Sequence, residues 1–190
     1  IIAEHIYAFK QILVDKRASL NEKTEQWFTL NRGTSHPEVF SKCKIVCPQR
    51  SKTNTFGYNE CEWYAASDVF FLTNPKEGYD LKYLLGLLNS KLYFMWLYSK
   101  GKRKGETLEL TATPLSEIPI KKCGDREMAS IVLLVDSIIS AKKQGKDTSA
   151  LENQIDFLVY HLYGLTYDEV LIVDTETPIS REEYEAYKEK

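Results

Sequence analysis

The stretch LKYLLGLLNSKLYFMWLY at residues 81–98 is the most apolar part of the chain and organises the predicted fold. Its apolar residues recur every three or four positions, as they do along one side of a helix. Asp80 stands directly before the stretch and is suited to cap the N-terminus of that helix. Because the apolar surface is so wide, we expect this helix to be central and buried on more than one side. Its polar residues, including Lys82 and Lys91, exclude a membrane span.

Short β-type segments lie on both sides of this helix in the sequence. Residues 44–48 (KIVCP) have the β-branched character of a strand and end at a proline, which cannot continue a central strand. Residues 55–58 are predicted to form a short strand or a turn, residues 63–73 one or two strands, and residues 108–111 and 118–120 further short strands. Residues 101–105 are bounded by glycines and are predicted to form a flexible basic loop. We therefore expect a small mixed β-sheet around the central helix.

The two ends of the chain are predicted to be helical. An apolar stripe at residues 2–13 indicates an N-terminal linker helix. Residues 128–139 and 151–162 carry helical periodicity on either side of a polar connection, so they should pack as an antiparallel hairpin. Capping-box spacing occurs twice, at Ser149 with Glu152 and at Thr166 with Glu169.

Together these elements predict an α+β fold: a small mixed β-sheet around a central helix, with a C-terminal antiparallel helical hairpin and an N-terminal linker helix. At 190 residues, with 43% apolar and 27% charged residues, the chain has the composition of a globular domain and not of a disordered or fibrous protein. Four regions are expected: a linker helix at 1–24, an α+β region at 25–124, the hairpin at 125–173 and a loosely held acidic tail at 174–190.

Charge is distributed unevenly along the chain. The formal net charge is −2, but residues 1–124 carry 18 Lys and Arg against 13 Asp and Glu, whereas residues 125–190 carry 7 against 14. A basic part joined to an acidic part predicts one surface suited to an anion and another that faces away from it.

The sequence contains no recognisable active site. Its three histidines lie on predicted helices or in a loop, with no pattern of a nucleophilic triad. No P-loop or dinucleotide glycine pattern occurs, and residues 74–77 (NPKE) depart from the Asn-Pro-Pro-aromatic motif of adenine methyltransferases. Cys43 and Cys47 have no second pair of metal ligands after them, which favours small buried hydrophobic residues over a zinc site. We predict no catalytic residue and no metal ligand in this chain.

The start of the chain and its cysteines suggest where the protein works. The sequence does not begin with Met and opens inside a predicted helix, so we expect it to be a piece of a longer protein. No basic segment followed by an apolar one marks a secretion signal, and the cysteines are expected to be free thiols. We therefore expect a cytoplasmic protein.

Two clusters of positive charge fall in the basic half. The first contains Lys42 and Lys44 and continues into a polar loop at residues 49–54 (QRSKTN). Arginine can pair with guanine, glutamine and asparagine with adenine, and lysine, serine and threonine with phosphate. The candidates for base or near-base contact in this loop are Gln49, Arg50, Lys52, Thr53 and Asn54.

The second cluster is the basic run at residues 100–105 (KGKRKG). Its cations supply a field for phosphate, and its glycines would let the backbone approach closely. The candidates for phosphate contact are Lys100, Lys102, Arg103 and Lys104, and Arg32 is a candidate for either set. One such cluster alone is as often a solvated loop, but two in the same half favour nucleic acid.

At these residues the sequence resembles a known family. KIVCPQRSKTNTF at 44–56 and WYAASDVFF at 63–71 are similar to the TaqI-like specificity domain, the target-recognition domain of fused restriction–modification enzymes and adenine-N6 DNA methyltransferases. Four further segments in the same order resemble its central helix, the loop and strand that follow, and its closing helix: YLLGLLNSKL at 83–92, KRKGE at 102–106, PLSEIPI at 114–120 and IDFLVYHLYGLT at 155–166.

The resemblance implies a division of labour. The chain would read double-stranded DNA, while methyltransferase and nuclease domains N-terminal to it in the same polypeptide would do the chemistry. S-adenosylmethionine and Mg²⁺ are implied for those catalytic domains and not for this chain. The methyltransferase domain would then flip the target adenine out of the duplex.

Two other classes of function compete with this interpretation. In the first, the helices form a protein–protein interaction module and the basic loops only keep it soluble. In the second, the partner is RNA, but neither a pair of strands with stacking aromatic residues nor a GxxG loop is evident.

Overall fold

The computed structural model describes residues 2–28 and 37–187 and divides into two compact units, Ile1–Pro37 and Glu38–Lys190. The first unit contains helices α1 (Ile2–Tyr7) and α2 (Lys10–Ser19) and the short 3-10 helix η1 (Thr24–Gln26). The single helix expected over residues 2–13 is therefore wrong, because the chain breaks between α1 and α2, where the Phe9 side chain is exposed.

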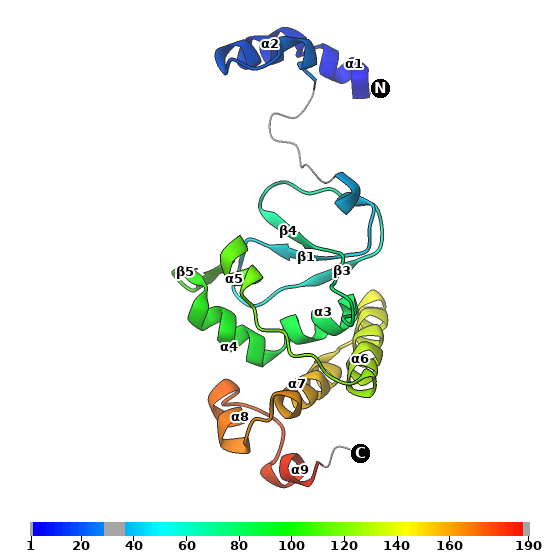
Figure 1. Ribbon diagram of the computed structural model, residues 1–190, viewed down its shortest axis with the longest axis vertical. Helices are drawn as coiled ribbons and strands as arrows, with labels where there is room; N and C mark the ends of the chain where they lie inside the picture. The colour runs from blue at the N-terminus through cyan, green and yellow to red at the C-terminus, as the bar shows by residue number, and fades with distance from the viewer. Residues whose placement is uncertain (1, 29–36, 188–190) are drawn as a thin grey trace. The chain divides into compact units, whose positions relative to one another are not determined.

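The second unit begins with the 3-10 helix η2 (Pro37–Phe40) and a three-stranded sheet, which we call sheet A. Its strand order is β3 (Gly57–Asn59), β1 (Lys44–Pro48), β4 (Val69–Leu72), and both pairings are antiparallel. One side of β1 buries Ile45 and Cys47 completely against the main hydrophobic core. Figure 1 shows this sheet above helix α3.

A second three-stranded sheet, sheet B, contains Arg50 of the first basic segment and residues 102–104 of the second. Its strand order is β2 (Arg50–Ser51), β6 (Thr107–Glu109), β5 (Lys102–Lys104), again entirely antiparallel. The α+β class is confirmed, but the mixed sheet that we expected is instead two antiparallel sheets. The basic run is a strand and not a flexible loop, and residues 118–120 form no strand but follow a short helix, α5 (Ala112–Ser116).

One residue connects the two sheets. Gln49 lies between β1 and β2, and its backbone N–H donates to the Asp68 carbonyl oxygen just before β4, at 2.7 Å. Its carbonyl oxygen accepts from the Leu110 N–H just after β6, at 2.8 Å. The path of the chain through Gln49 therefore fixes sheet B relative to sheet A.

The central helix lies where we predicted it, but it is broken into two helices. It comprises α3 (Leu81–Asn89), capped by the Asp80 carboxylate as expected, and α4 (Lys91–Lys100), with Ser90 extended between them (ψ 157°). The Ser90 hydroxyl donates to the Leu87 carbonyl and accepts from the Tyr93 N–H, so it caps both helices. Serine favours such local bonds over continuing a helix.

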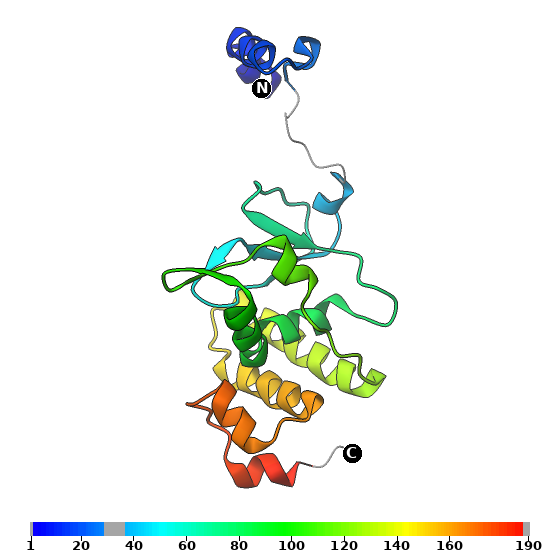
Figure 2. The same ribbon diagram turned by 60° about the vertical axis from the view of Figure 1, so that its left-hand side comes forward.

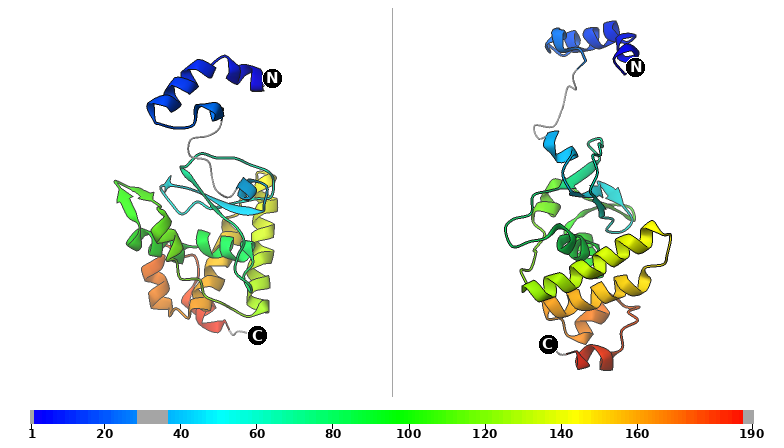
Figure 3. Two further views of the ribbon diagram at one scale, coloured as in Figure 1. Left: turned by 45° about the horizontal axis from the view of Figure 1, so that its top comes forward. Right: turned by 90° about the vertical axis from the view of Figure 1, so that its right-hand side faces the viewer.

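Helix α3 lies between sheet A and the C-terminal hairpin, and Leu85, Leu87 and Leu88 are buried there. The hairpin consists of α6 (Asp125–Lys143) and α7 (Ser149–Tyr163), which lie side by side in Figures 2 and 3. A Cβ on Gly86 would stand 2.7 Å from the Ile131 side chain, so this glycine permits close packing of α3 on α6.

One of the two predicted capping boxes is confirmed and the other is not. The box at Thr166 and Glu169 begins α8 (Tyr167–Val173), whereas Ser149 is instead the first residue of α7 and binds the Asp147 carboxylate.

The expected loose tail is wrong over the described part of the chain. It forms α9 (Arg181–Ala186) and buries Ile179 and Tyr184 against α7 and α8. The region boundaries expected at residues 24, 124 and 173 stay predictions. Among the described helices, none combines the length and apolar content needed to cross a membrane.

Candidate nucleic-acid interface

Sheet B brings Arg50 of the first basic cluster beside the second cluster, although the two lie about fifty residues apart in the sequence. Strand β2 comes from the first cluster and β5 from the second, and β6 pairs with both of them. In the left view of Figure 3 these strands lie at one side of the unit, with the hairpin of β5 and β6 in green. Arg50 and the second cluster therefore share one surface instead of lying on two separate loops.

The strand register decides which cations point outward. Leu108 in β6 is 1% exposed, so its side of the sheet faces the core. Residues directly opposite each other in an antiparallel pair share a face, and neighbours along a strand alternate. Glu109 is paired with both Arg50 and Lys102, and Thr107 with Lys104. The outer face consequently carries Arg50, Lys102 and Lys104, with Glu109 among them.

Glu109 is the one acidic residue in the strands of this sheet, and Arg50 neutralises it. The Arg50 Nε and Nη2 atoms donate to the same Glu109 oxygen at 3.1 and 2.8 Å. The hydrogen bond from Arg50, with the nearby charges of Lys104 and Lys102, lowers the pKa of the Glu109 carboxyl. The acid is therefore ionised at neutral pH and holds the Arg50 guanidinium at the sheet surface.

Arg103 has a different position from its two neighbouring lysines. It is paired with Leu108, and its guanidinium carbon lies 4.3 Å from the centre of the Tyr98 ring in α4. This is the geometry of a cation–π contact. Arg103 remains exposed at the sheet edge, but its side chain has a partner in the protein.

The two glycines of the basic run are required by the backbone conformation. A Cβ on Gly101 would come within 2.6 Å of the Leu97 carbonyl oxygen, so glycine is needed where the chain leaves α4 and enters β5. Gly105 has φ +64° at the turn between β5 and β6. Lys100, the last residue of α4, is exposed beside this turn from helix to strand.

The loop from Gln49 to Gly57, which we call the recognition loop, separates its polar residues into two groups. Lys52 and Thr53 are exposed, and Gln49 is half-buried. The Asn54 side chain instead turns inward, and its amide nitrogen donates to the carbonyls of Leu88 and Ser90 at 2.8 and 2.9 Å. Base contact by Asn54 stays an untested prediction, but the amide nitrogen already has acceptors inside the protein.

Two further basic residues of the predicted clusters and candidates, Arg32 and Lys44, are not assigned to this surface. Arg32 lies outside the described residues. Lys44 is completely buried, and its ammonium group donates to the carbonyls of Phe40, Lys42 and Cys61 at 2.8–2.9 Å. Lys44 therefore holds the entry to β1 together and contributes no charge to the surface.

The remaining chemistry-bearing residues form no second site in the parts of the chain that the structure describes. Burial raises the pKa of the Cys47 thiol to about 12, which makes it an inert core residue. No group of three His, Cys, Asp or Glu side chains within residues 2–28 and 37–187 is placed to hold a metal ion.

Sequence reasoning missed two residues that shape this surface. Glu109 looks like any polar position in an alternating strand, and only the pairing with Arg50 gives it a role. Asn89 binds the backbone of the recognition loop, and the pair Asn89-Ser90 inside an apolar helix was a usable signal, because both residue types favour helix ends.

The sequence profile of the TaqI-like C-terminal specificity domain matches residues 4–120, which include both sheets and helices α3 and α4. The chain is 28% identical over 160 residues to the Type II methyltransferase M.MjaIV of Methanocaldococcus jannaschii, covering 83% of this chain and 53% of the relative.

Two further relatives come from Haemophilus influenzae, the Type II methyltransferases M.HindII and M.HincII. Each is 30% identical over 115 residues, covering 56% of this chain and 22% of the relative. The chain thus spans about half the length of one curated relative and about a fifth of the other two. Because the profile match covers more than half of the sequence, the chain belongs to the family of TaqI-like C-terminal specificity domains.

Proposed function

We propose that this chain is the sequence-specific double-stranded DNA recognition domain of a restriction–modification enzyme. The observation that supports this most directly is that Arg50 of the first basic cluster lies with Lys102 and Lys104 of the second on the outer face of sheet B. The major groove of B-form DNA admits a two-stranded β-ribbon, and the hairpin of β5 and β6 has that form. Its cations match the phosphates that line such a groove.

Each side chain has a proposed role that follows from its place on the sheet. Lys102 and Lys104 on the outer face contact phosphates, together with Lys100 and Arg103 at its edge. Arg50, held by Glu109, reads a base edge in the groove.

The exposed recognition-loop residues Lys52 and Thr53 contact phosphate or base beside Arg50, and Gln49 supports them. Asn54 is left out of this set because its amide nitrogen binds α3 carbonyls.

The wider context is also part of the proposal. In a longer enzyme this domain would set the register of an adenine-N6 methyltransferase domain and a nuclease domain on the DNA, in the cytoplasm. The methyltransferase domain would flip the target adenine. S-adenosylmethionine and Mg²⁺ would be held by those domains, and no residue of this chain is assigned to them.

A gel shift with random-sequence duplex DNA at several salt concentrations tests the function. The double variant K102Q/K104Q should weaken binding to every duplex and reduce the salt slope by about 0.9 for each lost phosphate contact. The matched control is K143Q/K146Q, which removes the same charge from exposed positions at the end of α6 and in the connection to α7. Equal losses in both variants, or no binding by the unmodified chain, would leave the helical protein-interaction module as the better description.

A further inference from the structure

The recognition loop has few hydrogen bonds of its own. Arg50 and Ser51 belong to β2 and Gly57 to β3, and the residues from Lys52 to Phe56 have no ladder partner in the sheets that the structure describes. A loop that reads bases must nevertheless present its side chains in a fixed geometry, because a hydrogen bond to a base edge is directional. The contacts that hold Asn54 and Phe56 therefore decide how well the loop can discriminate.

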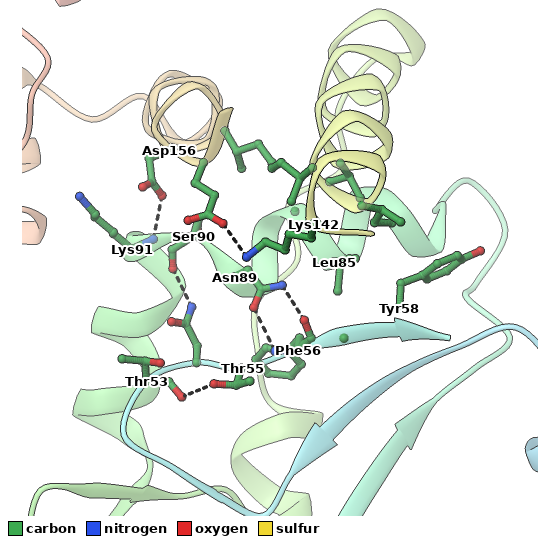
Figure 4. A pocket seen from close by; sticks show the side chains of 18 of the residues that line it. Thr53, Thr55, Phe56, Tyr58, Leu85, Asn89, Ser90, Lys91, Lys142 and Asp156 are labelled. Atoms are coloured by element: carbon green, nitrogen blue, oxygen red, sulfur yellow. Dashed lines mark hydrogen bonds and ion pairs between the residues drawn. The ribbon is translucent and has the colours of Figure 1, made fainter. Parts of the chain in front are cut away.

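Asn89, the last residue of α3, binds the recognition loop at both polar atoms of one residue. Its Oδ1 accepts from the Phe56 backbone N–H at 3.0 Å, and its Nδ2 donates to the Phe56 carbonyl at 2.9 Å. Figure 4 shows both bonds at the edge of a cavity of about 640 Å³ between the loop and helices α3, α6 and α7. The amide thus replaces the strand partner that Phe56 lacks.

Asn54 makes the reverse connection from the loop to the helix. Its amide nitrogen donates to the Leu88 and Ser90 carbonyls where α3 ends, and the Ser90 carbonyl also accepts from the Phe94 N–H of α4 at 3.0 Å. Four hydrogen bonds from two asparagines thus join the recognition loop to the break between α3 and α4. We call this pair the asparagine clasp.

The same break also sets the position of the second basic cluster. Helix α4 starts at Lys91, whose backbone N–H donates to the buried Asp156 carboxylate of α7 at 2.8 Å. Helix α4 then leads through Gly101 directly into β5. The break between α3 and α4 therefore positions both the recognition loop, through hydrogen bonds, and strand β5, through helix α4.

We propose that Asn89 is a positioning residue for base reading, which fixes the recognition loop so that Arg50 and its neighbours meet the DNA in register. The inference rests on the proposed function. Asn89 contacts backbone alone and carries no charge toward DNA, so it acts on discrimination and not on the electrostatic part of affinity.

The test uses the nearly isosteric variant N89D, which replaces the donor to the Phe56 carbonyl by a carboxylate oxygen. The matched control is N153D, because Asn153 lines the same cavity from α7 and lies outside the clasp. N54A is a second variant that breaks the clasp from the loop side without adding charge to the core. Thermal unfolding of each variant checks that the fold is kept.

The first measurement is amide hydrogen exchange of the free chain. N89D and N54A should speed exchange at Phe56 and along the recognition loop about tenfold, while N153D should not. Unchanged exchange would overturn the clasp without reference to DNA.

The second measurement selects bound sequences from a pool of random duplexes. The unmodified chain should enrich a preferred site, and N89D and N54A should lower its preference over random DNA about tenfold with an unchanged salt slope. Preserved preference in both variants would overturn the positioning role alone. An unmodified chain without any preference would overturn the proposed function and the positioning role with it.

Discussion

Sheets A and B have the same number of strands and are joined through one residue, yet they use their basic residues in opposite ways. In sheet A, Lys44 is completely buried, and three backbone carbonyls accept hydrogen bonds from its ammonium group. In sheet B, Lys102 and Lys104 are exposed on the outer face. The two kinds of lysine cannot be told apart by composition, because both lie in short basic segments.

Strand register, and not the density of charge in the sequence, decides which basic residues of these two sheets are exposed. Lys44 begins β1 opposite Asn59, where the backbone of residues 40–42 and 61 closes over it. Lys102 pairs with Glu109 on the face that the core does not cover. A binding surface should therefore be assigned from pairing before any basic residue is given a role.

The largest expected effect is on sheet A. Replacing Lys44 by Met should lower the free energy of unfolding by about 3–5 kcal/mol, since three buried carbonyls lose a charged donor. Urea denaturation of the full chain measures this change. The control K42M alters an exposed lysine and should change stability by less than about 0.5 kcal/mol. A loss as small in K44M as in K42M would show that Lys44 is solvated and would break the comparison.

A buried acid, Asp156, and a partly exposed acid, Glu109, should also differ in how they affect stability. Burial raises the pKa of the Asp156 carboxyl from 3.8 to about 6, although the hydrogen bond from the Lys91 N–H and the Lys91 charge lower it. Between about pH 4 and pH 6 the folded state keeps a proton that the unfolded chain has lost, so stability falls as the pH rises through this window. D156N should remove that fall, and above pH 6 it should be more stable than the unmodified chain by about 3 kcal/mol.

The control for this pH dependence is E109Q on sheet B. The pKa of the Glu109 carboxyl is lowered, first by the hydrogen bond from Arg50, so its contribution to stability is present at neutral pH and is lost as the pH falls. The two variants should therefore change the stability profile in opposite directions, with a smaller change for Glu109, which is less buried than Asp156. Urea denaturation from pH 4 to pH 7 compares them, and a parallel response would contradict the assignment of Asp156 as the buried acid.

Sequence patterns were sufficient where structure depends on neighbours in the chain. The cap at Asp80 and the central position of α3 follow from local residue types and helical period, and both are confirmed. The break at Ser90 was missed because the apolar period continues across it, although a serine hydroxyl competes with the helical hydrogen bonds there.

The arrangement of the candidate site could not be derived in the same way. The pairing of Arg50 with Glu109 joins residues 59 positions apart, and nothing local to either residue specifies it. Lys42 and Lys44 look alike in the sequence, and only the closure of the chain over β1 separates the exposed one from the buried one. Residue types thus predicted a kind of ligand, while long-range pairing determines which basic residues share one exposed face.

Arg50 is expected to show an effect at one position of the DNA site. R50A should cost about 1–3 kcal/mol of binding free energy at the base pair that it reads and should relax the preference there. Binding measured against single-base variants of the selected site shows this change. An equal loss over all sequences would make Arg50 a phosphate contact and would remove base reading from the outer face of sheet B.

The smallest expected effect separates Arg103 from Lys102 within one strand. Lys102 has its side chain on the outer face, so K102Q should reduce the salt slope of DNA binding by about 0.9. Arg103 lies over the Tyr98 ring, so R103Q should reduce the slope less and should instead lower stability by about 0.5–1 kcal/mol. In a Y98L background, R103Q should lose its effect on stability, because the ring that holds the guanidinium is gone. Equal slopes for K102Q and R103Q would show that alternation along β5 does not govern contact with DNA, and the outer face would then have to include both sides of that strand.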